Sequence, residues 1–144
     1  MTLDLIVDIM GGSATIGRVI HHAVDFMKVS QEGMPVNVIR EIQQRLNFTN
    51  KEISQFLDIS ESTLQRYFRA GHTLKKDEAE KAYQVSKVIA KGLEVFENDA
   101  DFREWLHTSN TAMGGAEPIA WMSSSIGREQ LLDLLVSIEY GMYS

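Results

Sequence analysis

Apolar residues recur at intervals of three and four along nearly the whole chain, and only two prolines interrupt this spacing. Such spacing places apolar side chains on one face of an α-helix, whereas strict alternation would indicate a half-buried strand. The exception is residues 3–10, whose apolar run fits either a strand or a helix. Apolar residues make up 44% of the 144 residues, enough to form a buried core. We therefore predict an all-α fold.

Turn residues and N-cap residues divide the first two thirds of the chain into expected helices. Gly11-Gly12 interrupts a first helical segment over residues 3–27, and Pro35 suits the first turn of a second helix. The apolar face expected for the first segment consists of Ile16, Val19, Ile20, Ala23, Val24 and Met27.

Two short helices and a long one follow. Thr49 or Asn50, and then Ser60, suit the N-caps of the short helices, and Gly71 suits the end of the second. A long helix is expected over residues 77–96.

The last third has a different pattern. We expect a short helix over residues 101–106, a glycine-containing loop over 110–117, a short helix opened by Pro118 and an amphipathic helix over 128–140. The apolar face expected for the last helix consists of Leu131, Leu132, Leu134, Leu135 and Ile138. Residues 97–144 contain eight acidic and two basic residues.

The two short helices fit the positional pattern of a helix-turn-helix. Ser54 is small where two such helices must approach closely, and Asp58 falls in the turn, where a left-handed residue is needed. Asp and Asn adopt that conformation more readily than most residues with a side chain. Two adjacent helices that merely pack together are the alternative interpretation. The apolar positions of the pattern are filled by Ile53, Leu57, Ile59, Leu64 and Tyr67.

Charge and side-chain chemistry favour DNA as the partner of this motif. Residues 36–76 contain seven basic and four acidic residues, a net charge of +3. The whole chain has a net charge of −6, so the residues outside this segment have a net charge of −9. Short hydroxyls at the start of the second helix and long donors along one stripe suit base edges and phosphates. Ser62, Gln65 and Arg66 are best placed for bases, and Arg69, Lys75 and Lys76 for phosphates. The full predicted DNA-binding set is Thr49, Asn50, Ser60, Ser62, Thr63, Gln65, Arg66, Arg69, Lys75 and Lys76.

Short motifs in the tail carry a resemblance to a known family. Gly114-Gly115 is followed by Pro118, Gly127 precedes the last helix, and residues 138–141 read Ile-Glu-Tyr-Gly. Together with Trp105-Leu106 and the preceding helix-turn-helix, this order resembles the Xre/MbcA/ParS antitoxins over residues 35–144. Met113 stands where that family more often has Leu, and residues 121–125 are more polar and aromatic than usual.

The resemblance implies an Xre-like helix-turn-helix followed by a toxin-binding region, a RES-type toxin that consumes NAD as partner, and repression of the shared operon. It also divides the chain into an N-terminal helical segment (1–34), a DNA-binding domain (35–96) and a toxin-binding domain (97–144). The leucines of the last helix are expected to close the protein's own core. The residues that the resemblance assigns to the toxin are Gly114, Gly115, Pro118, Ile138, Glu139, Tyr140, Gly141, Tyr143 and Ser144.

Other functions find little support in the sequence. There is no cysteine, the adjacent His21 and His22 point to different helix faces, and no catalytic spacing stands out, so we expect no enzyme, metal or cofactor. No signal-peptide pattern and no apolar stretch of roughly 20 residues occur, so we expect a cytoplasmic protein without membrane contact. A homodimer on a palindromic operator is expected, because single modules make few contacts. A stand-alone regulator, whose tail serves dimerisation or effector sensing, remains the alternative.

Overall fold

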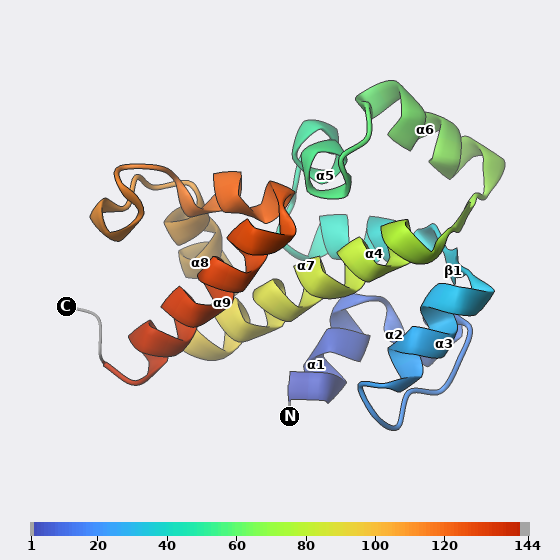
Figure 1. The fold of residues 1–144 in the computed structure, drawn as a ribbon, viewed down its shortest axis with the longest axis horizontal. Coiled ribbons are helices and arrows are strands. Elements are labelled where there is room, and N and C mark those ends of the chain that lie inside the picture. The colour runs from blue at the N-terminus through green and yellow to red at the C-terminus, as the bar shows by residue number, and fades with distance from the viewer. Residues whose placement is uncertain (1, 142–144) are drawn as a thin grey trace.

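The computed structural model describes residues 2–141, and its regular secondary structure is almost entirely helical (Figure 1). The α-helices are α1 (Thr2–Ile9), α2 (Gly12–Ile16), α3 (Asp25–Glu32), α4 (Asn37–Arg45), α5 (Asn50–Leu57), α6 (Glu61–Ala70), α7 (Lys76–Val95), α8 (Asp99–Leu106) and α9 (Ser125–Glu139). Two 3₁₀ helices, η1 (Thr111–Met113) and η2 (Pro118–Ser123), lie between α8 and α9. The all-α prediction is confirmed.

Helix α7 runs through the centre of the molecule (Figure 1). Its 20 residues contact α1, α3, α4, α5, α8 and α9. Small side chains along one face allow close approach there, since Ala79, Ala82 and Ala90 are completely buried. The buried apolar residues of all parts of the chain, from Ile6 to Leu135, therefore form one core around α7.

The N-terminal prediction was wrong in its helix and in its apolar face. Gly17, at φ 86°, ends α2, and the carboxylate of Asp25 accepts hydrogen bonds from the backbone N–H groups of His21 and His22. These bonds lower the pKa of Asp25 and stabilise a turn where a continuous helix was expected. Val19, Val24 and Met27, which the prediction placed on the inner face, are 59–60% exposed.

A short antiparallel pair of strands was also missed. Strand β1 (Met34–Pro35) pairs with β2 (Thr73–Leu74), with Met34 opposite Leu74 and Pro35 opposite Thr73. Pro35 therefore lies in a strand, and α4 begins after it at Asn37. The pairing joins the segment before α4 to the segment after α6, so the two ends of the α4–α6 region lie side by side.

The C-terminal elements lie as the sequence predicts, with α9 starting three residues early. Leu131 and Leu135 are completely buried against α7, which confirms that the leucine face closes the protein's own core. The buried Arg128 of α9 links α7 and η2, because its guanidinium donates to the side-chain oxygen of Gln84 in α7 and to the carbonyl of Met122 in η2. Within residues 2–141, no helix is long and apolar enough to cross a membrane.

Gly92 provides a test of the packing between α7 and α8. A Cβ at this position would lie 2.0 Å from the completely buried ring of Phe102. We expect Gly92→Ala to destabilise the protein by about 1–3 kcal/mol, because overpacking a dense core outweighs the helix propensity that alanine adds. Urea unfolding followed by circular dichroism measures the change. An unchanged or higher unfolding free energy would contradict this packing.

Candidate nucleic-acid interface and partner-binding surface

Both short helices of the helix-turn-helix begin with a capped N-terminus. The hydroxyl of Thr49 accepts from the backbone N–H of Glu52 at 3.0 Å, and the Glu52 carboxylate accepts from the backbone N–H of Thr49 at 2.9 Å. This reciprocal capping box fixes the start of α5. The hydroxyl of Ser60 accepts from the N–H of Thr63 at 3.1 Å and caps α6 in the same way. Thr49, rather than Asn50, is therefore the N-cap of α5.

The interior of the motif is built as the positional pattern predicts. Ser54 is buried, and its hydroxyl donates to the carbonyl of Lys51 at 2.7 Å, so it needs no partner across the interface. Asp58 adopts the left-handed conformation, with φ 56° and ψ 47°, and ends α5. Ile53, Leu57 and Leu64 are buried between the helices and α7. Two helices that merely pack together would need none of these special positions.

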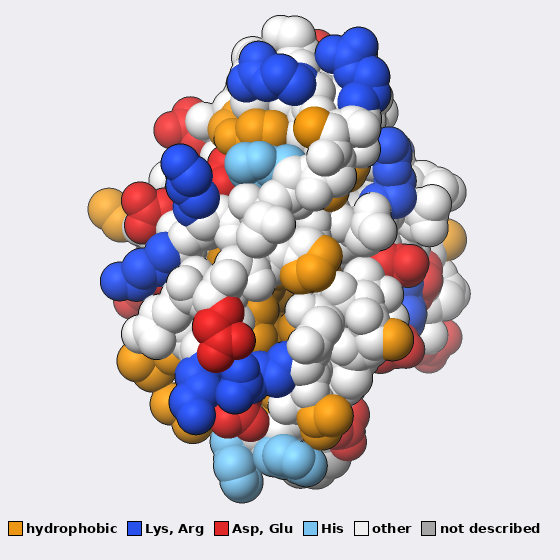
Figure 2. All heavy atoms as spheres, turned by 90° about the vertical axis from the view of Figure 1, so that its right-hand side faces the viewer, with side chains coloured by type: hydrophobic (Ala, Val, Ile, Leu, Met, Phe, Trp, Pro, Cys, Tyr) orange, Lys and Arg blue, Asp and Glu red, His pale blue; other side chains and the backbone are white. Residues whose placement is uncertain are grey.

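The outer face of α6 presents an exposed polar stripe. Ser62, Gln65, Arg66 and Arg69 are all exposed. Figure 2 shows Lys and Arg side chains at the top of the molecule, where α6 lies, and others lower on the same face, where acidic side chains lie beside them. Long donors on a capped helix that projects from the body have the chemistry and the access that a DNA groove requires.

The remaining predicted DNA-binding residues lie around this stripe in different situations. The hydroxyls of Ser60 and Thr63 bond to each other at 2.9 Å, so both serve the cap. Asn50 is half-buried, and its side-chain oxygen accepts from the amide of Gln43 at 2.8 Å. Lys75 is exposed at the start of α7, whereas Lys76 lines a hollow of about 450 Å³ between α3 and α7.

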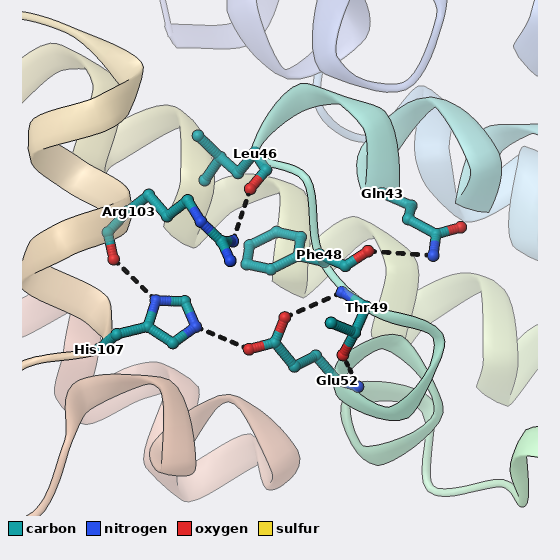
Figure 3. A network of polar contacts seen from close by, with 7 residues as sticks. All are labelled: Gln43, Leu46, Phe48, Thr49, Glu52, Arg103 and His107. Carbon is teal, nitrogen blue, oxygen red and sulfur yellow. Dashed lines mark hydrogen bonds and ion pairs between the residues drawn. The ribbon is translucent and has the colours of Figure 1, made fainter.

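A polar network joins the start of α5 to α8 (Figure 3). Nε2 of His107 lies 2.6 Å from the Glu52 carboxylate, and Nη1 of Arg103 donates to the carbonyl of Leu46 at 2.7 Å. Burial raises the pKa of Glu52, but the hydrogen bonds from His107 and from the N–H of Thr49 outweigh it and leave the pKa below its ordinary value. This contact could not be predicted from the sequence, because His107 and Glu52 lie 55 positions apart.

The glycine loop and the end of α9, which carry most of the described residues assigned to a protein partner, lie at the opposite end of the molecule from α6, whereas η2, which begins at Pro118, packs against α5 (Figure 1). Gly114 and Gly115 are exposed with positive φ angles, and Tyr140, next to the exposed Gly141, is 71% exposed. The other members are more tied to the fold. Pro118 is buried at the start of η2, Ile138 is half-buried, and the Glu139 carboxylate pairs with Lys91 of α7 at 2.7 Å. Tyr143 and Ser144 lie outside the described residues.

Residues 2–141 hold no group of three or more His, Asp or Glu side chains that could bind a metal ion. His21 and His22 are exposed, and His72 stacks on the ring of Tyr67 with its centroid 3.8 Å away. The carboxylates of Asp99 and Asp101 occupy the first turn of α8, behind the N-cap Asn98, where acidic residues favour the helix dipole.

Comparison with protein families agrees with this arrangement. Residues 25–87 match the antitoxin Xre-like helix-turn-helix domain, and residues 91–141 match the antitoxin Xre/MbcA/ParS C-terminal toxin-binding domain. The two matches meet within α7, so one continuous helix contributes to both domains. A search of curated proteins finds no match. With both domains present in this order, the chain belongs to the Xre/MbcA/ParS family of antitoxins.

Proposed function

We propose that this antitoxin neutralises a RES-type toxin, which consumes NAD, through its C-terminal surface, and represses its own operon through α6. The observation that carries the proposal is the separation of the two exposed surfaces, which lie at opposite ends of one core (Figure 1). A toxin bound near Tyr140 leaves the outer face of α6 accessible to DNA. The protein acts by binding alone, without catalysis or a cofactor, in the cytoplasm where the operator and the toxin's NAD are found.

At the operator, α6 enters the major groove. Ser62, Gln65 and Arg66 contact base edges there, because they project from the first two turns of the exposed face. Arg69 and Lys75, with support from Lys76, contact phosphates on one side. The first turn of α5, with Thr49 and Asn50, meets the backbone on the other side through its N-terminal N–H groups.

At the toxin, the end of α9 and the glycine loop form the contact. Tyr140 buries a large aromatic surface and still offers a hydroxyl, which favours it as an interface anchor. The eight acidic residues against two basic ones in residues 97–144 favour association with a cleft that is basic because it binds NAD phosphates. Gly114 and Gly115 allow close backbone approach, and Pro118 and Ile138 position this surface from within.

Dimerisation on a palindromic operator is also part of the proposal. Val24 and Met27 expose apolar side chains at the start of α3, and Val19 is exposed in the loop that precedes it. An apolar surface of this kind suits contact with a second copy of the chain. A pair of copies doubles the number of base contacts and matches the symmetry of a palindrome.

A stand-alone regulator whose C-terminal domain serves only dimerisation is the second candidate. It predicts no protection against any toxin. Co-expression with the product of a neighbouring RES-type gene discriminates the two, because only an antitoxin restores growth.

Arg66 and Lys75 separate base recognition from phosphate contact. We expect Arg66→Ala to weaken operator binding by about 1–3 kcal/mol and to relax the sequence preference, because a base contact is lost. Lys75→Ala is expected to weaken binding to all sequences alike and to reduce the salt slope of log K by about one. Fluorescence titration of both variants at several salt concentrations measures both effects. Unchanged binding by both variants would refute the assigned DNA-binding face.

Tyr140 tests the toxin-binding surface. We expect Tyr140→Ala to weaken toxin binding by about 2 kcal/mol or more, the loss typical of an interface anchor, while leaving DNA binding unchanged. Calorimetric titration with the purified toxin measures the loss, and growth rescue reports it in cells. Ile126→Ala is the matched control, because Ile126 is equally exposed, at 74%, but lies at the other end of α9. Equal toxin binding by wild type and Tyr140→Ala would place the interface elsewhere.

The dimer is tested by Val24→Glu combined with Met27→Glu. Two charges in an apolar interface are expected to convert the dimer to a monomer at micromolar concentration, because they are costly to desolvate. Sedimentation velocity measures the change. A wild-type monomer that binds one per DNA site would exclude dimerisation.

A further inference from the structure

The structure places two side chains of the toxin-binding domain against the DNA-binding domain. We infer that His107 and Arg103 are positioning residues for DNA binding, because they hold the turn between α4 and α5 and the first turn of α5 in place. This inference rests on the proposed binding of operator DNA. It assigns to α8, which lies outside the DNA-binding domain, a role in the affinity for DNA.

The Glu52 carboxylate is the point at which the two domains join. One of its oxygens accepts from the backbone N–H of Thr49 at 2.9 Å, which closes the capping box of α5. The other oxygen lies 2.6 Å from Nε2 of His107, at the end of α8 (Figure 3). Any movement of His107 is therefore transmitted to the residue that caps α5.

Arg103 holds the same turn from its other side. Leu46 ends α4, and its carbonyl has no partner within the helix, so the guanidinium of Arg103 supplies one at 2.7 Å. The next residue, Asn47, adopts a left-handed conformation with φ 55°, and the buried Phe48 follows. The turn thus has a strained residue at its centre and a donor from α8 at its start.

His107 is itself fixed in orientation. Its Nδ1 lies 2.8 Å from the carbonyl of Arg103, and its Nε2 faces the Glu52 carboxylate. Both ring nitrogens therefore face oxygen atoms, one in a backbone carbonyl and one in a carboxylate. Charge-assisted hydrogen bonds of this kind are stronger than neutral ones. The neighbouring η2 segment, which packs against both α5 and α8, contains no ionisable residue.

Because of its position, loss of this contact should lower the affinity for DNA more than it lowers the stability of the fold. Ile53, Phe56 and Leu57 anchor the rest of α5 in the core, so losing the contact leaves the helix folded. The first turn, however, carries the N–H groups and the Asn50 side chain that are proposed to meet phosphate. A small displacement of this first turn would weaken its hydrogen bonds to phosphate, because hydrogen bonds weaken steeply as distance and angle depart from their ordinary values.

The test uses the full-length protein and a duplex of the region upstream of its own coding sequence. We expect His107→Ala to weaken binding by roughly three- to tenfold, the range of a modest coupling between contacting groups. His107→Gln is expected to restore most of the affinity, because its amide can donate to Glu52. His22→Ala, at an exposed histidine far from α5 in the sequence, is the matched control and should bind as wild type.

Glu52→Gln provides a second variant that keeps the capping box, since glutamine also serves at that position. We expect it to weaken binding less than His107→Ala does, because the glutamine amide can still bond to His107 but lacks the charge of the carboxylate. The double variant should bind no more weakly than His107→Ala, which already lacks the contact. Urea unfolding of each variant checks that the binding loss is not a loss of folded protein. If His107→Ala is not folded, Glu52→Gln against wild type decides the question alone.

The outcomes separate this inference from the function on which it rests. Weaker binding by His107→Ala and Glu52→Gln, with rescue by His107→Gln, supports the positioning role. Wild-type affinity in both variants, with binding still lost in Arg66→Ala, overturns the inference and leaves the proposed DNA binding intact. A wild-type protein that does not bind the duplex overturns both.

Discussion

The burial of α7 on several sides at once is the constraint on which the rest of the structure depends. Small residues let neighbouring helices approach closely: Ala79, Ala82, Ser86 and Ala90 lie along one face of α7, and Gly92 lies on another face, against Phe102. Helix α7 packs against α4 and α5 of the helix-turn-helix region and against α8 and α9 of the C-terminal region. The two family matches meet within this helix, and the two domains share one hydrophobic core, so no flexible linker separates them.

A second consequence of this arrangement is the polar contact between the domains. The shared core brings α8 beside the turn between α4 and α5, where Glu52 and the carbonyl of Leu46 need partners. His107 and Arg103 supply them. In our proposal, the DNA-binding surface is positioned partly by the domain that is matched to toxin binding, although the two proposed surfaces lie at opposite ends of the molecule.

The sequence predicted the helix-turn-helix well because that motif fixes residue types by position. Ser54, Asp58 and Leu64 occupy the places the pattern requires, and the structure confirms each. The C-terminal helices were found because their apolar spacing is regular. Helical spacing failed in the N-terminal segment, where Gly17 and the Asp25 turn break the helix and leave Val19 exposed.

Two other features could not be predicted, for different physical reasons. Strands β1 and β2 contain two residues each, too few to show alternation in the sequence. The contact between His107 and Glu52 joins two residues 55 positions apart and depends on how their helices pack. The residues around His107 in the sequence do not indicate this contact. The exposed stripe on α6 was predictable because it is what remains when the buried positions of a helix are known.

The central claim is that one rigid core carries two separate binding surfaces, and backbone hydrogen exchange tests it most directly. The protein is measured alone, with operator DNA and with the toxin. We predict that DNA slows exchange in the first turns of α5 and α6, and that toxin slows exchange around Gly114 and at the end of α9. Protection of the same amides by both partners, or protection of α6 by the toxin, would contradict the account.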